Sequence, residues 1–123
     1  MELVVRLAWL ALAALHLPPA AVGLLPRLAE SLYGVAPGGD LGVLIAHRGI
    51  LFAGVAAAAL TAAFHVPSRR MAVIVVGLSV AGFLATYARA GMPEGLRSIA
   101  LADLVALVPL TLVAFTAFRS QAA

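Results

Sequence analysis

Four apolar segments dominate this chain of 123 residues, at about residues 4–25, 43–65, 70–89 and 98–118. A helix needs about 20 apolar residues to cross a hydrocarbon core about 30 Å thick, and each segment has that length. The interiors of the segments contain two fixed charges, Arg48 in the second and Asp103 in the fourth. The natural solvent for such segments is lipid.

Composition supports this interpretation and narrows the class of protein. The chain is 64% hydrophobic and 11% charged, whereas a soluble domain has about 25% charged residues. Because the apolar segments show no alternation of polar and apolar residues, we expect helices and not barrel strands. The sequence therefore predicts an all-α integral membrane four-helix bundle with antiparallel up-down topology, forming a single domain over residues 1–123.

The basic residues indicate the kind of organism and the orientation of the chain in the membrane. All eight are arginine, and together with the many alanines this favours GC-rich bacterial coding and a location in the bacterial cytoplasmic (inner) membrane. Four of them fall on one side of the predicted bundle: Arg6, Arg69, Arg70 and Arg119. Because cytoplasmic loops are enriched in Lys and Arg, both termini are predicted to be cytoplasmic. No basic stripe occurs, so the net charge of +3 does not indicate a nucleic-acid partner.

The first segment has an alternative interpretation as a cleaved signal peptide. Arg6 precedes a leucine- and alanine-rich run, and "PPAAVG" supplies small residues for cleavage. Against it, Glu2 weakens the positive start, and the apolar run continues to Leu25. Pro18 and Pro19 are expected to kink this helix, or to end it before a short interfacial helix.

The two charges inside the segments are predicted to lie at equal depth. Arg48 and Asp103 each fall about six residues, or roughly 9 Å, below the outer end of their helices. An unpaired charge in hydrocarbon costs roughly 2.5–3.5 kcal/mol even on lenient scales. We therefore expect an Arg48–Asp103 ion pair; the alternative is that Arg48 extends alone to the headgroups.

Further polar residues gather in the same outer half of the predicted bundle. The candidate ligand-binding or intramembrane polar cluster consists of His47, Arg48, Asp103, Arg89, His16, Asp40, Tyr33 and Tyr87. A polar cup over an apolar floor suits the head of an amphipathic ligand. No metal site is predicted, because cysteine is absent and the histidines are isolated.

Two other patterns allow more than one interpretation. His16 and His47 suggest axial haem ligands, but their depths differ by roughly 7 Å, so no cofactor is expected. Small residues recur along the second helix at Gly42, Ala46, Gly49, Ala53 and Ala57. This spacing permits close helix contact, which we expect inside the bundle more than in a dimer.

With "LYGV" (32–35), Asp40, "HRGILF" (47–52) and "ALADLVAL" (100–107), the chain resembles small bacterial four-helix membrane proteins of the DoxX type, over nearly its whole length. The resemblance implies that Tyr33, Gly34, His47, Arg48 and Asp103 are signature positions. Similar proteins are sometimes labelled phosphopantetheine adenylyltransferases. Such enzymes are soluble α/β proteins with a Gly-His motif after a strand, and this chain has neither feature.

No catalytic motif occurs, neither a P-loop, a dinucleotide fingerprint, a zincin motif nor a nucleophile elbow. The leading hypothesis is a non-enzymatic membrane protein whose pocket binds a lipid, a quinone, another amphipathic molecule or a partner helix. Its expected partners are membrane lipid and a second membrane protein or a further copy of the chain. One alternative is a small membrane enzyme or redox accessory subunit that uses His47 and Asp103 for proton transfer; another is a transporter subunit.

Overall fold

Helices form nearly all of the described chain, which is residues 1–119 of a computed structural model, and no strand occurs in that part. The elements are α1 (Glu2–Leu24), α2 (Leu28–Tyr33), α3 (Gly39–Phe64), η1 (Val66–Ser68), α4 (Arg69–Arg89), η2 (Glu94–Leu96) and α5 (Arg97–Arg119). Residues 120–123 of the predicted single domain lie outside the described residues.

Four of these elements, α1, α3, α4 and α5, match the predicted spans to within a few residues. Together with their short 3-10 extensions they are long and apolar enough to cross a membrane. The all-α prediction is therefore confirmed, as is the prediction of four helices of spanning length. The largest difference is at α3, which begins at Gly39, four residues before the predicted start, with Asp40 in its first turn. An acidic side chain there complements the helix dipole, which favours the earlier start.

Pro18 and Pro19 do not end the first helix, because α1 continues through both prolines to Leu24. The separate short helix α2 then follows and ends at Tyr33, and the next residue, Gly34, has a φ of 67° that suits a glycine after a helix C-terminus. A short helix therefore follows the first span, but it begins ten residues after Pro18.

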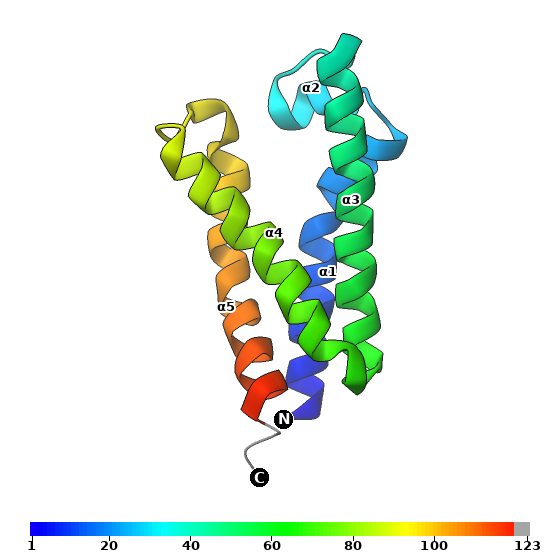
Figure 1. Cartoon of the computed structure of the whole chain (residues 1–123), viewed down its shortest axis with the longest axis vertical. Helices are drawn as coiled ribbons and strands as arrows, with labels where there is room; N and C mark the ends of the chain where they lie inside the picture. Colours follow the sequence, from blue (N-terminus) through cyan, green and yellow to red (C-terminus); the bar gives the residue numbers. More distant parts are fainter. Residues whose placement is uncertain (120–123) are drawn as a thin grey trace.

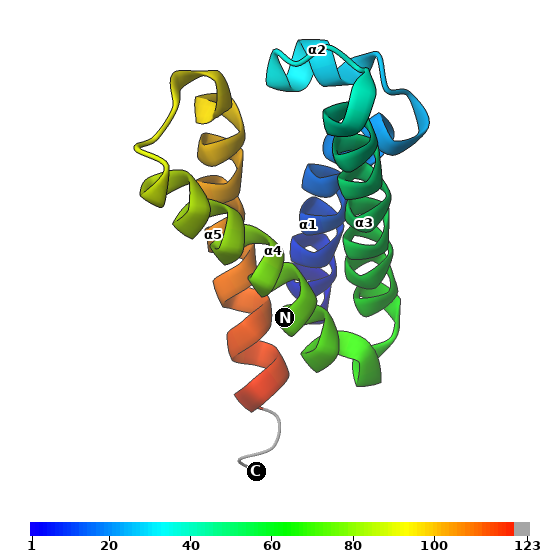
Figure 2. The ribbon, with the colours of Figure 1, turned by 45° about the horizontal axis from the view of Figure 1, so that its top comes forward.

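The beginning of α1, the end of α5 and the α3–α4 turn lie at one end of the bundle (Figure 1), here called the termini end. Arg69 of the turn donates to Glu2 of α1, with Nη1–Oε2 at 3.1 Å, and Arg70 Nε donates to the carbonyl oxygen of Ala117 in α5 at 3.1 Å. The opposite end carries α2 and is called the α2 end. There the α1–α3 half and the α4–α5 half diverge, as Figures 1 and 2 both show.

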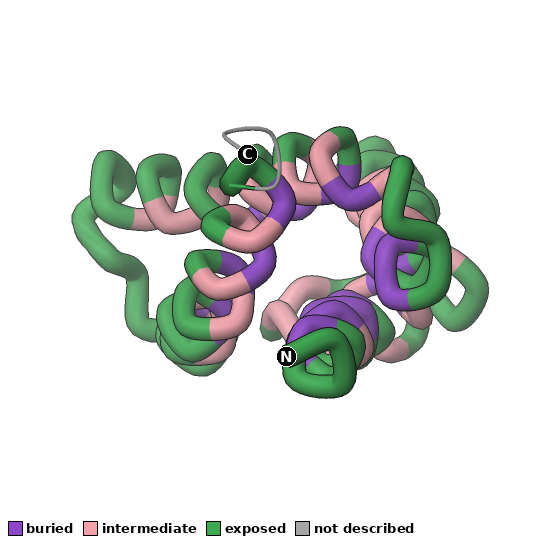
Figure 3. The backbone as a smooth tube through the Cα atoms, turned by 90° about the horizontal axis from the view of Figure 1, so that it is seen from below, coloured by how far each residue is buried: buried purple, intermediate pink, exposed green. Residues whose placement is uncertain are grey.

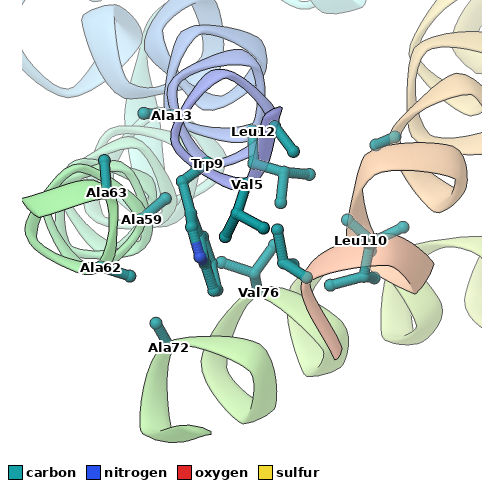
Figure 4. Close-up of a cluster of buried hydrophobic side chains, with 14 residues drawn as sticks. Val5, Trp9, Leu12, Ala13, Ala59, Ala62, Ala63, Ala72, Val76 and Leu110 are labelled. Atoms are coloured by element: carbon teal, nitrogen blue, oxygen red, sulfur yellow. The ribbon is translucent and has the colours of Figure 1, made fainter. Parts of the chain in front are cut away.

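The apolar core lies toward the termini end. Seen from below (Figure 3), the four long helices form a ring whose buried residues face inward. Figure 4 shows Trp9 pointing from α1 toward Ala62, Ala72 and Val76. Trp9 is 0% exposed, so its side chain belongs to the core and not to an aromatic belt at the membrane surface.

Helices α1 and α3 approach most closely at two glycines. A Cβ on Gly49 would lie 2.8 Å from the Cα of Gly23 and 3.0 Å from the carbonyl oxygen of Pro19. The predicted small-residue contact is therefore observed at Gly49. Ala53 and Ala57 instead line an exposed apolar groove between α1 and α3, and the buried positions of α3 further along are Ala56, Ala59, Ala62 and Ala63.

Candidate functional site

A cavity of about 920 Å³ extends from the α2 end into the bundle, between α1 and α5. Five polar residues from four helices line it: His16, Tyr33, Arg48, Ser98 and Asp103. The rest of the lining is apolar and comes mainly from α1 and α5. A volume of this size matches the sites that hold small-molecule ligands.

Arg48 enters this cavity from α3 and is surrounded by aromatic rings. Its guanidinium carbon lies 5.0 Å from the centre of the Phe52 ring, 5.5 Å from that of Tyr33 and 5.6 Å from that of Phe83. A cation–π contact stabilises a charge by about 0.5–1 kcal/mol at an exposed site and by about 2 kcal/mol or more when it is desolvated. Among residues 1–119, no hydrogen bond or ion pair occupies the donors of Arg48. The rings hold the charge in place and leave its N–H groups available.

Asp103 lies on the α5 wall of the same cavity, half-buried. It is within electrostatic range of His16 and Arg48. The predicted direct pair with Arg48 is nevertheless wrong, because the ion pairs within residues 1–119 are Arg6–Glu2 and Arg69–Glu2. The two charges line one cavity without forming an ion pair, and the guanidinium lies among rings that come from α2, α3 and α4.

His16 is buried at the point where α1 faces α4. Its Nδ1 lies 2.7 Å from the carbonyl oxygen of Leu12, and its Nε2 lies 3.4 Å from Ser79 Oγ. Because a carbonyl oxygen only accepts, Nδ1 must donate, and Nε2 of the neutral ring then accepts from Ser79. The ring centre also lies 5.8 Å from that of Phe52. His16 is therefore a fixed polar element of the cavity wall.

Prolines supply additional acceptors around the cavity. Pro18, Pro19 and Pro109 all line it, and each lacks the N–H that would bond the carbonyl oxygen four residues earlier. The carbonyl groups concerned belong to Ala14, Leu15 and Val105, which line the same cavity. In lipid, such freed carbonyls need another donor, so their concentration here favours a polar occupant.

A second cavity, of about 600 Å³, lies between α3 and α4. It shares Arg48 and Phe52 with the first cavity and is otherwise lined mainly by apolar residues of these two helices. The two cavities therefore share the Arg48 side chain, and both lie between the α1–α3 half and the α4–α5 half.

Four of the eight predicted site residues come together at the first cavity: His16, Tyr33, Arg48 and Asp103. Tyr87 is linked indirectly, because its ring stacks on that of Phe83 at 6.0 Å between centres. His47, Asp40 and Arg89 are exposed and line neither cavity. His47 is therefore not at the rim of the pocket, because one residue along a helix turns the side chain by about 100°.

Sequence reasoning missed two of the three aromatic side chains that surround Arg48, Phe52 and Phe83. Phe52 follows Arg48 by four residues, a spacing that places both on one helix face, and this signal was present in the sequence. Phe83 comes from another helix, and no local pattern indicates its contact with Arg48.

His16 and His47, the two residues considered as haem ligands, lie in different surroundings. No group of three or more His, Cys, Asp or Glu side chains within the described residues could hold a metal ion. His16 is buried, with both ring nitrogens near protein oxygens, whereas His47 is exposed on α3. The two rings therefore do not converge on a common position for an iron ion.

Burial raises the pKa of Tyr33, which lies in α2 outside the spanning helices, and the nearby Arg48 charge lowers it less. The phenol therefore stays protonated at neutral pH and keeps an O–H donor beside Arg48.

Comparisons with protein families, with curated proteins and with solved structures find no match to this chain.

Proposed function

We propose that this protein binds an amphipathic molecule in the cavity between α1 and α5, with the polar head of the molecule at Arg48. The observation that carries the proposal is an arginine inside a spanning helix whose donors meet no acceptor within residues 1–119. Intramembrane charges are rare, and they usually mark a functional site. An acceptor on a bound molecule would satisfy this one.

The cavity walls support an amphipathic occupant over a purely polar one. Val105 and Val108 line the cavity and are also 64% and 75% exposed, so the cavity opens onto the lipid-facing surface. A molecule could thus keep its apolar part among lipid tails while its head contacts Arg48 and Tyr33.

The proposal also covers the membrane in which the protein lies and its orientation there. We place it in a bacterial cytoplasmic membrane with both termini in the cytoplasm. The support is the gathering of Arg6, Arg69, Arg70 and Arg119 at the termini end, since Arg-rich ends remain cytoplasmic. The cavity would then lie in the outer half of the bilayer.

The alternative of a proton-transferring enzyme that uses His47 with Asp103 gains no support from the positions of these residues. His47 is exposed and lines neither cavity, whereas Asp103 lines the first. A general base must reach the same reacting group as its partner.

The test compares Arg48→Gln with His47→Gln, a matched change at the neighbouring exposed position. Protein purified in mild detergent is examined by native mass spectrometry and by untargeted analysis of extracted small molecules. A specific molecule should co-purify with the wild type and with His47→Gln, and should fall on the order of tenfold in Arg48→Gln. Identical extracts from all three proteins would contradict the proposal.

A further inference from the structure

The two cavities that share Arg48 open at different places on the surface of the bundle. The first opens between α1 and α5, where Val105 and Val108 are exposed. The second opens between α3 and α4, where Leu51 and Leu78 are 58% and 73% exposed. Both therefore lead from one polar point to the lipid-facing surface, in two directions. A molecule with one head and two apolar chains fits this arrangement.

The charges of the first cavity indicate the chemistry of the head. Arg48 offers N–H donors, and Asp103 offers carboxylate oxygens, yet they form no ion pair with each other or with other groups of residues 1–119. A neutral head such as a quinone would leave both charges unpaired in a low-dielectric site, which is costly. A purely anionic head would pair Arg48 alone. A head with both an anion and a cationic donor would pair both.

Phosphate and a primary ammonium are the groups that suit these two residues. The planar guanidinium binds phosphate oxygens through two parallel hydrogen bonds, and the Tyr33 hydroxyl lies on the same side of the cavity as a further donor. An ammonium carries three N–H donors. Asp103 can accept one of them, and the carbonyl oxygens freed by Pro18, Pro19 and Pro109 belong to residues of the same cavity wall.

We infer that the ligand is a two-chain aminophospholipid, whose phosphate binds Arg48, whose ammonium binds Asp103, and whose two chains leave through the α1–α5 and α3–α4 openings. This inference rests on the proposed function and assigns the class of its ligand. It gives Asp103 a role in selecting the head and Phe52, shared by both cavities, a position between the two chains.

Head selection is tested with three lipids that share two oleoyl chains: phosphatidylethanolamine, phosphatidylglycerol and phosphatidylcholine. Each is added to delipidated protein in detergent, and the bound lipid is counted by native mass spectrometry. The wild type should prefer phosphatidylethanolamine on the order of tenfold, because only this lipid combines a phosphate with N–H donors on a cation. Equal binding of the three lipids would overturn the inference.

Two variants separate the roles of the charges. Asp103→Asn should abolish the preference for phosphatidylethanolamine while the protein still binds phospholipid. Arg48→Gln should weaken the binding of all three lipids, and His47→Gln should bind them as the wild type does. Should Arg48→Gln not fold, Arg48→Lys keeps the charge without the bidentate geometry and should weaken phosphate binding in the same direction. A preference that survives Asp103→Asn would contradict the assignment of the ammonium to Asp103.

The inference that one of the two lipid chains occupies the second cavity is tested by a substitution that fills this cavity. Gly82 lines it, and a side chain at this position meets open space, so Gly82→Leu should reduce binding of the two-chain lipid by at least severalfold and leave lyso-phosphatidylethanolamine unchanged. Gly77→Leu is the control, because Gly77 also borders open space but does not line the cavity. Equal effects of both variants on both lipids would contradict the two exits.

Failure of this inference and failure of the proposed function give different results. A quinone analogue or an oleate ion that binds the wild type and is lost in Arg48→Gln, without phospholipid binding, would overturn the aminophospholipid alone. If no amphipathic molecule, including these two, binds in an Arg48-dependent manner, both proposals are wrong.

Discussion

The backbones of Gly23 and Gly49 touch where α1 crosses α3. A Cβ on Gly23 would lie 2.8 Å from the amide nitrogen of Ile50, and one on Gly49 would lie 2.8 Å from the Cα of Gly23. The nearest neighbours at both positions are backbone atoms, which cannot move aside as a flexible side chain can. Because Arg48 precedes Gly49, this contact also fixes where the arginine enters the first cavity.

The first prediction concerns this contact. Gly49→Ala should lower the free energy of unfolding by roughly 1–3 kcal/mol, because the added methyl group forces the two helices apart. Gly54→Ala is the control, since Gly54 lies in the same helix with open space around it, and alanine there should be neutral or slightly stabilising. Thermal unfolding in detergent, followed by circular dichroism, measures both. Equal melting temperatures for the two variants would show that the contact does not limit packing.

Arg69 is expected to be the most sensitive basic residue for stability. It is 7% exposed, and it donates through Nε to the carbonyl oxygen of Ala62 at 3.0 Å as well as to Glu2. Arg69→Gln should lower the melting temperature by several degrees, because a buried carbonyl oxygen and a carboxylate lose their donors. Arg6→Gln removes an exposed i,i+4 pair with the same Glu2 and should have little effect. A comparable loss in both variants would be inconsistent with a special role for Arg69.

Trp9 provides a direct test of the core. It is the only tryptophan of the chain and it is fully buried among four helices. Its fluorescence should therefore resist quenching by lipids brominated on their acyl chains, whichever bromine position is used. Strong quenching at one depth would place the ring at the lipid-facing surface and would contradict the packing in Figure 4.

The next prediction concerns how the stability of the protein depends on pH through Tyr33. Burial raises its pKa above the usual value near 10.0, so the neutral phenol is favoured in the folded protein. The resulting stability is present below about pH 10, the pKa of an unfolded tyrosine, and is lost as the pH rises through the raised folded pKa. The ultraviolet difference titration between the wild type and Tyr33→Phe should show a midpoint above 10. A midpoint at or below 10 would mean that Tyr33 is not held in the apolar wall around Arg48.

The amino-acid sequence alone indicates a membrane protein and specifies its four long helices. Long apolar segments with almost no internal charge can satisfy their backbone groups in lipid only as helices, so the four spans could be assigned to within a few residues. The gathering of His16, Tyr33, Arg48 and Asp103 toward the α2 end also followed from counting along these helices, since the position along a helix depends on the rise per residue alone.

The directions in which the side chains face, and the groups that they contact, depend instead on how the helices pack. Helix rotation placed Arg48 in the cavity and its neighbour His47 outside it. Phe83 of another helix joined Phe52 and Tyr33 around the guanidinium, which keeps Arg48 from the predicted pair with Asp103. Arg69, which reads as a simple turn residue, became a buried link to Glu2. These contacts depend on the rotation and spacing of helices far apart in sequence, and in an alanine-rich chain the local pattern specifies neither.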